Sequence, residues 1–104
     1  MFVILFEKVP GVEASRQQIR RHVQHVRALD SQGQLVLCGP FTDHPGGMIV
    51  LRARDKAEAV RIAEADPFVS EGTRTFEVRT WELASAENDF MDPGPGDGDE
   101  PPPP

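Results

Sequence analysis

The order in which apolar runs and capped helical segments follow one another constrains this fold more than any other feature of the sequence. Four short runs rich in strand-forming residues lie at 2–6, 35–38, 48–51 and 76–79. Two further segments, between the first and second runs and between the third and fourth, each begin with a capping box. The boxes are formed by Ser15 with Gln18 and by Asp55 with Glu58. The chain is therefore predicted to form the order strand, helix, strand, strand, helix, strand.

Turn chemistry predicts where the two helices end. Gly33 is placed to terminate the first helix, because glycine accepts the left-handed conformation that commonly follows a helix. The second helix is expected to stop at Ala65, because Asp66 precedes Pro67 and a residue before proline is biased away from helical geometry. Helical spacing predicts one inward face on the first helix, made of Ile19, His22, Val23, Val26 and Leu29.

The predicted order is the split β-α-β arrangement of a ferredoxin-like α+β domain. Right-handed crossovers place both helices on one face of the sheet, and this topology puts the strands at 2–6 and 48–51 in its centre. Both central strands are apolar at every position, which is typical of strands that are buried on two faces. Since no further element of the domain is left to cover the second face, a second copy of the chain is expected to cover it in a homodimer.

The segment 85–104 differs in composition from the rest of the chain. It holds six acidic residues, no basic residue and six of the ten prolines. Because the segment has too little apolar surface to offset the entropy cost of ordering it, residues 85–104 are predicted to be disordered. Residues 1–84 are predicted to form the single folded domain. The net charge of −6 belongs to this tail, because all 11 basic residues and 11 of the 17 acidic residues lie within 1–84.

Charge and motif content argue against several classes of function. A neutral domain gives no support for nucleic-acid binding, which favours a basic face. One cysteine excludes an internal disulfide, and no run approaches the roughly 20 apolar residues of a membrane span. The run at 2–6 lacks the basic flank of a signal peptide, so a cytoplasmic location is expected. Because the sequence contains no Rossmann fingerprint or phosphate loop, no cofactor is predicted.

His22 and Asp66 form the most coherent candidate for chemistry. A histidine oriented by a carboxylate moves protons near neutral pH. His22 lies on the predicted inner face of the first helix, and Asp66 directly follows the second. Each also has a structural interpretation: His22 as a core histidine with a satisfied hydrogen bond, and Asp66 as the N-cap of a short turn that begins with Pro67. Spacing in the sequence does not decide between these interpretations.

The other reactive side chains form weaker patterns. His25 and His44, with Asp43 or Cys38, are residue types that bind metals, but their spacing does not match a known metal motif. The sequence has no histidine pair at i, i+4 and no second cysteine. His25 is expected near the helix surface and His44 in a loop, so no metal site is predicted. Cys38 is interpreted as a packed, inert strand residue, because a reactive thiol needs an accessible, electropositive setting.

An ordered set of residues across 2–83 resembles the YciI-like, or YCII-related, proteins. The set comprises His22 followed eleven residues later by Gly33, the strand 35–40 ending in Gly-Pro, Glu58-Ala59, Ala65-Asp66-Pro67-Phe68, Gly72 and Trp81. The resemblance implies a ferredoxin-like fold and a homodimer built as a dimeric α+β barrel. It also implies an active site of one histidine and one aspartate, which fall on His22 and Asp66.

The resemblance leaves the reaction open. One characterised branch of the family resembles a dehydrochlorinase that acts on a chlorinated hydroxyhydroquinone, and nothing in this sequence assigns the chain to that branch. We expect cofactor-independent acid–base chemistry, an elimination or isomerisation, on a small organic substrate in the barrel cavity. Asp66 would fix the tautomer of His22, and the second ring nitrogen would move the proton. The alternative is a dimer that binds a small metabolite, or acts in regulation, without turnover.

Overall fold

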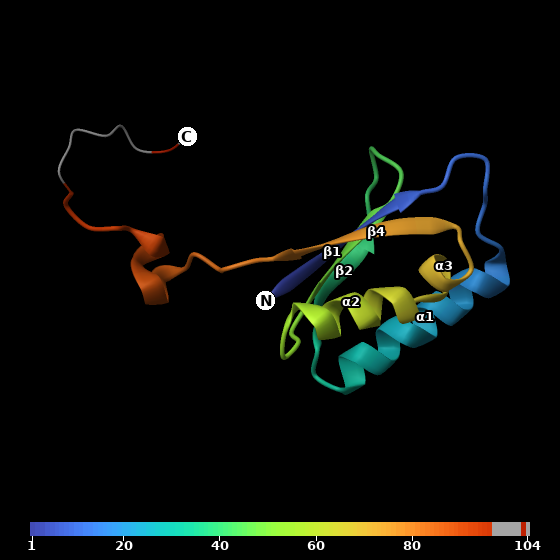
Figure 1. Cartoon of the computed structure of the whole chain (residues 1–104), viewed down its shortest axis with the longest axis horizontal. Helices are drawn as coiled ribbons and strands as arrows, with labels where there is room; N and C mark the ends of the chain where they lie inside the picture. The colour runs from blue at the N-terminus through green and yellow to red at the C-terminus, as the bar shows by residue number, and fades with distance from the viewer. Residues whose placement is uncertain (97–102, 104) are drawn as a thin grey trace.

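Four antiparallel strands form one sheet, and the helices cover one of its faces (Figure 1). The structure is a computed structural model that describes residues 1–96 and 103. Its elements are β1 (Phe2–Lys8), α1 (Arg16–Ser31), β2 (Leu35–Pro40), β3 (Gly47–Leu51), α2 (Lys56–Ala65), α3 (Pro67–Ser70), β4 (Arg74–Thr80) and the 3-10 helix η1 (Ala86–Met91). The predicted ferredoxin-like α+β fold is confirmed. Across the described ranges, no helix combines the length and the hydrophobicity needed to cross a membrane.

The strand order β2-β3-β1-β4 places β1 and β3 in the centre of the sheet, as predicted. Ile4 of β1 lies opposite Ile49 of β3 and Val78 of β4, and these side chains face the helices. Their exposed fractions are 0 %, 2 % and 6 %. The same core contains Phe2, Phe6, Leu51, Ala59 and Ala63. Burial of the larger side chains, at about 1.5–3 kcal/mol each, is the main stabilising contribution to the fold.

The first helix begins and ends as predicted, but it turns a different face inward. Ser15 accepts a hydrogen bond from the backbone N–H of Gln18 at 3.0 Å, and Gly33 follows the helix at a φ of 75°. The prediction that Ile19 and Val23 face the core is wrong, because they are 45 % and 37 % exposed. Gln18 takes an inward position instead and is 4 % exposed. Its side chain forms a buried hydrogen bond with Thr73, in the segment that follows α3, and this contact favours the observed rotation of the helix.

A β-bulge in β2 divides the apolar side chains of this strand between the two faces of the sheet. Leu35 lies opposite Leu51 on the helix-covered face, whereas Leu37 lies opposite Val50 on the helix-free face. Leu37 is 67 % exposed. Cys38 is exposed as well, so the prediction that it packs inside a strand is wrong. The reason is that β2 lies at the edge of the sheet.

The helix-free face of the sheet is apolar in its centre. Val3 and Val50 lie opposite each other on this face and are buried within the single chain. Leu5 and Met48 form the next pair on the same face and are partly exposed. The homodimer that would cover this face stays a prediction.

The described part of the predicted disordered tail contains η1. The Ser85 N–H donates to Asn88 Oδ1 at 2.9 Å, and Asn88 Nδ2 donates to the Leu83 carbonyl at 2.7 Å. Figure 1 shows this segment running away from the sheet and helices. The prediction of disorder at 97–102 and 104 lies outside the described residues, and the domain boundary at 84 stays a prediction.

Candidate functional site

Asp66 ends α2 and begins α3. Its backbone leaves helical geometry, with φ −66° and ψ 129°, as expected for a residue before proline. Pro67 then takes the first position of α3, where a missing N–H removes no helical hydrogen bond. The Oδ1 atom of Asp66 accepts a hydrogen bond from the Phe68 N–H at 2.9 Å. Asp66 therefore acts as the N-cap that the sequence suggested.

The second carboxylate oxygen of Asp66 contacts His22. The distance between His22 Nδ1 and Asp66 Oδ2 is 2.8 Å. The side chain of Asp66 is 0 % exposed and that of His22 is 21 % exposed. An ionised carboxylate only accepts hydrogen bonds, so Nδ1 carries the hydrogen and the neutral imidazole keeps its lone pair on Nε2. Asp66 thus combines the two contacts that the sequence presented as alternatives, one on each oxygen.

Phe68 fixes the plane of the His22 ring. The two ring centroids lie 4.1 Å apart, and the ring planes make an angle of 22°. The guanidinium carbon of Arg74 lies 4.7 Å from the centre of the same phenyl ring. Since His22 covers one face of the ring, Arg74 covers the other. Phe68 contacts both candidate residues, because its backbone N–H also binds Asp66.

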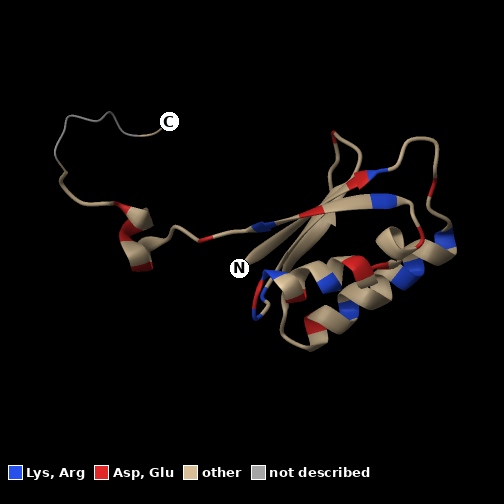
Figure 2. Ribbon diagram, viewed as in Figure 1, with Lys and Arg blue, Asp and Glu red and all other residues tan. Residues whose placement is uncertain are grey.

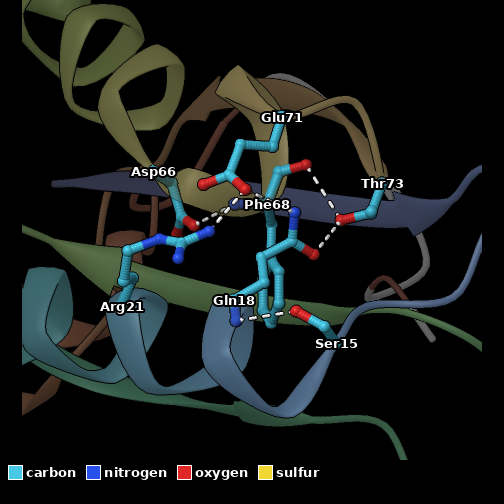
Figure 3. Close-up of polar contacts among 7 residues, drawn as sticks. All are labelled: Ser15, Gln18, Arg21, Asp66, Phe68, Glu71 and Thr73. Carbon is cyan, nitrogen blue, oxygen red and sulfur yellow. Dashed lines mark hydrogen bonds and ion pairs between the residues drawn. The ribbon is translucent and has the colours of Figure 1, made fainter.

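A buried polar contact joins α1 to the segment after α3, one helical turn before His22. The Thr73 hydroxyl lies 2.8 Å from Gln18 Oε1 and 3.2 Å from the carbonyl oxygen of Phe68 (Figure 3). Gln18 and Thr73 are 4 % and 5 % exposed. Loss of this contact would leave a buried amide or hydroxyl without its partner, which costs free energy.

Glu71 extends this contact to the surface. Gln18 Nε2 donates to Glu71 Oε1 at 3.4 Å, and Arg21 forms an ion pair with the same carboxylate (Figure 3). The sequence assigned Gln18 only to a capping box. Its position four residues before His22, on the same helix face, was the signal available for a role in placing the histidine.

The remaining candidates from the sequence lie outside this cluster. His25 Nε2 lies 3.1 Å from the carbonyl oxygen of Ile62, and the His44 ring lies 6.3 Å from that of Phe41 in the loop between β2 and β3. Cys38 is exposed at the edge of the sheet. In the part of the chain that the structure describes, no three His, Cys, Asp or Glu side chains are grouped to hold a metal ion.

Two surface hollows lie apart from the His22–Asp66 contact. One of about 500 Å³ lies on the outer side of α1, beside Arg16 and Arg20. The other, of about 340 Å³, lies over β1 and β4 and is also lined by Phe41 and His44. Neither hollow is lined by His22 or Asp66. The predicted barrel cavity requires a second chain and stays a prediction.

The strand order and the helices on one face define a ferredoxin-like α+β domain, which here carries a histidine–aspartate contact where α2 meets α3. The YCII-related domain model matches residues 1–82. The chain belongs to the YCII-related domain family, as the sequence indicated.

Two known proteins show how this chain compares with relatives. The uncharacterized protein YjpA of Bacillus subtilis (strain 168) is 28 % identical over 83 residues, which cover 80 % of this chain and 98 % of YjpA. A solved structure of 5-chloro-2-hydroxyhydroquinone dehydrochlorinase (TftG) from Burkholderia phenoliruptrix AC1100, in complex with 2,5-dihydroxybenzoquinone, has a TM-score of 0.59. It is 22 % identical, covering 78 % of this chain and 92 % of that chain. At this identity the likeness shows the fold.

Proposed function

We propose that this protein is a small acid–base enzyme that needs no cofactor, with His22 as the proton-transfer group and Asp66 as the residue that orients it. One observation carries the proposal: a fully buried carboxylate holds Nδ1 of a histidine whose side chain is 21 % exposed. The carboxylate contacts no solvent, whereas the imidazole does. Such an arrangement leaves Nε2 as the basic atom of the pair.

Each residue of the cluster has a defined part in the proposed reaction. Nε2 of neutral His22 takes a proton from a carbon or hydroxyl of the substrate. The electron pair that remains forms a double bond as a leaving group departs, or shifts within the substrate in an isomerisation. Asp66 stabilises the imidazolium that forms, and His22 then returns the proton to the product or to solvent. Phe68 keeps the ring plane fixed during both transfers.

A ring-shaped or carbonyl-bearing substrate suits this chemistry. Such compounds delocalise the charge that appears when a proton leaves. TftG is described as a dehydrochlorinase, a catalyst of an elimination, and its structure holds a ring-shaped quinone. This supports an elimination on a small ring as a candidate reaction for this chain.

We also propose that the working form is a homodimer. A second copy packed on the helix-free face would cover Leu5, Leu37 and Met48 and close the two sheets into a dimeric barrel. The barrel would supply the enclosed, partly apolar cavity that a small-molecule site needs.

A panel of small hydroxylated, halogenated and dicarbonyl ring compounds tests the proposal. Turnover by the full chain is expected for at least one compound and is read from its ultraviolet spectrum. His22→Asn should reduce that turnover at least about 100-fold, which is the scale of general acid–base catalysis. His25→Asn, on the same helix, should keep it, because His25 binds the Ile62 carbonyl and lies outside the pair.

Full activity in His22→Asn would overturn the proposed role. Saturable binding without turnover across the panel would favour the alternative, a metabolite-binding or regulatory dimer. The hollow beside His44 favours this alternative, because a ligand bound there would lie apart from His22.

A further inference from the structure

The solvent side of α1 combines arginines with an exposed apolar pair. We call this surface the α1 outer face and define it by Arg16, Arg20 and Arg27 with Ile19 and Val23. At 100° per residue these five positions fall within an arc of about 100° on one side of the helix, and the buried Leu29 lies outside this arc. Ile19 and Val23, one turn apart on this surface, are 45 % and 37 % exposed.

The arginines of the α1 outer face have no acidic partner within residues 1–96. The ion pairs of this part of the chain leave out Arg16, Arg20 and Arg27, whereas Arg21, on the flank of the same helix, pairs with Glu71. Arg16, Arg20 and Arg21 border the hollow of about 500 Å³. This surface offers guanidinium groups around a depression, with apolar side chains beside them.

The segment around η1 presents the complementary chemistry. Phe90 and Met91 are 67 % and 46 % exposed and neighbour three acidic residues, Glu87, Asp89 and Asp92. Figure 2 shows this acidic turn at one end of the molecule and the basic residues of α1 at the other. None of the three carboxylates forms an ion pair within the described residues.

We propose that the η1 segment, residues 85–92, docks on the α1 outer face of a second copy of this chain. Phe90 and Met91 would cover Ile19 and Val23, and the acidic side chains would pair with Arg16 and Arg20 at the border of the hollow. Each partner would thus contribute both apolar side chains and charged groups to the contact. Charge complementarity around an apolar contact makes binding between two surfaces specific. The proposal does not depend on the sheet-mediated dimer, because α1 and the helix-free face lie on opposite sides of the sheet.

The position of the hollow favours a second copy over the same chain. Arg21, which borders the hollow, pairs with Glu71, three residues before β4 begins at Arg74. The tail leaves from the other end of β4, where the Trp81 N–H binds the Met1 carbonyl. To reach the hollow in its own chain, the tail must run back along β4, about 20 Å, and around α1. Trp81 to Phe90 spans at most about 31 Å when fully extended, and η1 shortens this reach.

A photo-crosslinking experiment on the full chain tests this docking. Phe90→p-benzoylphenylalanine keeps an aromatic ring at the contact and forms covalent bonds with neighbouring C–H groups on irradiation. Equal amounts of ¹⁴N- and ¹⁵N-labelled chains are mixed before irradiation, and cross-linked peptides are analysed by mass spectrometry. We expect mixed-isotope pairs that join the tail peptide to peptides of α1, with a yield that falls as salt is added.

Charge variants decide whether the α1 outer face is the binding surface. Arg16→Glu with Arg20→Glu should lower the yield of mixed-isotope pairs about tenfold, because attraction becomes repulsion. Arg61→Glu, which reverses one exposed charge on α2, should leave the yield of mixed-isotope pairs unchanged. A cross-linking chain that also carries Glu87→Arg and Asp89→Arg should restore the yield when mixed with the Arg16→Glu, Arg20→Glu chain.

Two outcomes overturn the proposal. Cross-links to α1 that are all of a single isotope would place the tail on its own chain. Cross-links spread over the surface, or a yield unchanged in the Arg16→Glu, Arg20→Glu chain, would mean that α1 is not the binding surface.

Discussion

His22 and Asp66 lie 44 positions apart in the sequence and 2.8 Å apart in the fold. The contact forms because α1 packs against α3 at the level where Asp66 begins that short helix. Asp66 cannot turn away from the histidine without losing its hydrogen bond from the Phe68 N–H. One buried carboxylate therefore fixes a helix start and a histidine tautomer together.

Asp66→Asn is expected to change the tautomer of His22 while the fold is kept. The asparagine oxygen replaces Oδ1 as the cap, so its NH₂ group faces His22 Nδ1. Nδ1 must then accept, and the hydrogen moves to Nε2. ¹⁵N chemical shifts of the imidazole report this directly, and stability should fall by about 1–3 kcal/mol. Asp66→Ala, which also removes the cap, should cost about 1 kcal/mol more. An unchanged tautomer in Asp66→Asn contradicts the orienting role.

Gln18 and Thr73 are expected to stabilise the domain as a coupled pair. Gln18→Leu and Thr73→Val each break the 2.8 Å contact, and each should lower the free energy of unfolding by about 1–3 kcal/mol. The double variant should recover about 0.5–1.5 kcal/mol relative to the sum, because no polar partner is then left alone. Urea unfolding measures all three. Gln17→Leu, an exposed change on the same helix, is the control. If the losses of unfolding free energy in Gln18→Leu and Thr73→Val simply add in the double variant, the coupling is refuted.

Leu37→Glu is expected to weaken the proposed sheet-mediated dimer. Leu37 is 67 % exposed on the helix-free face, where a second copy would bury the new charge at a cost of several kcal/mol. Sedimentation at micromolar concentration in high salt, which screens the charge pairs of the proposed η1 docking, should show a dimer for the unaltered chain and a monomer for the variant. Val12→Glu is the control, because Val12 is also an exposed apolar residue but lies in the loop before α1. This change should leave the dimer intact. A monomeric unaltered chain would remove the basis for the barrel cavity.

Truncation after Ala84 is expected to leave the melting temperature almost unchanged in dilute solution. The removed segment is acidic and rich in proline, and Phe90 is 67 % exposed. Docking on a second copy adds little to the folding of one domain when the chain is dilute. Thermal unfolding followed by circular dichroism is the measurement. A drop of several degrees would show that Phe90 and Met91 pack on their own domain.

Glu58 is expected to stabilise the start of α2 at neutral pH and to lose this effect in acid. Hydrogen bonding from the backbone N–H of Arg54 holds the pKa of Glu58 below its ordinary value; desolvation opposes this shift, and the Arg54 guanidinium adds to it. A carboxyl group whose pKa is lower in the folded state stabilises at pH values above its unfolded-state pKa. That contribution is lost as the pH falls through the folded-state pKa. Glu58→Gln should therefore lower the melting temperature slightly near neutral pH and not at strongly acidic pH. A difference of equal size at both pH values contradicts the assignment.

Local chemistry in the sequence determined the elements and their ends. Ser15, Gly33, Asp55 and the Asp66-Pro67 step act on residues a few positions away, so their effect is independent of the rest of the fold. The periods of the apolar residues set the element types, and the order of elements set the topology. The residue pattern also proposed His22 and Asp66 as a pair, and the family resemblance implied an active site at the same two residues.

Only the tertiary structure decided which side chains meet. The rotation of α1 follows from the buried contact between Gln18 and Thr73, and it leaves Ile19 and Val23 exposed where helical spacing alone predicted burial. The bulge in β2 that places Leu37 on the helix-free face depends on pairing with β3. These outcomes depend on packing between segments that are distant in the chain. Propensity, capping and periodicity, which act over a few residues, carry no information about them.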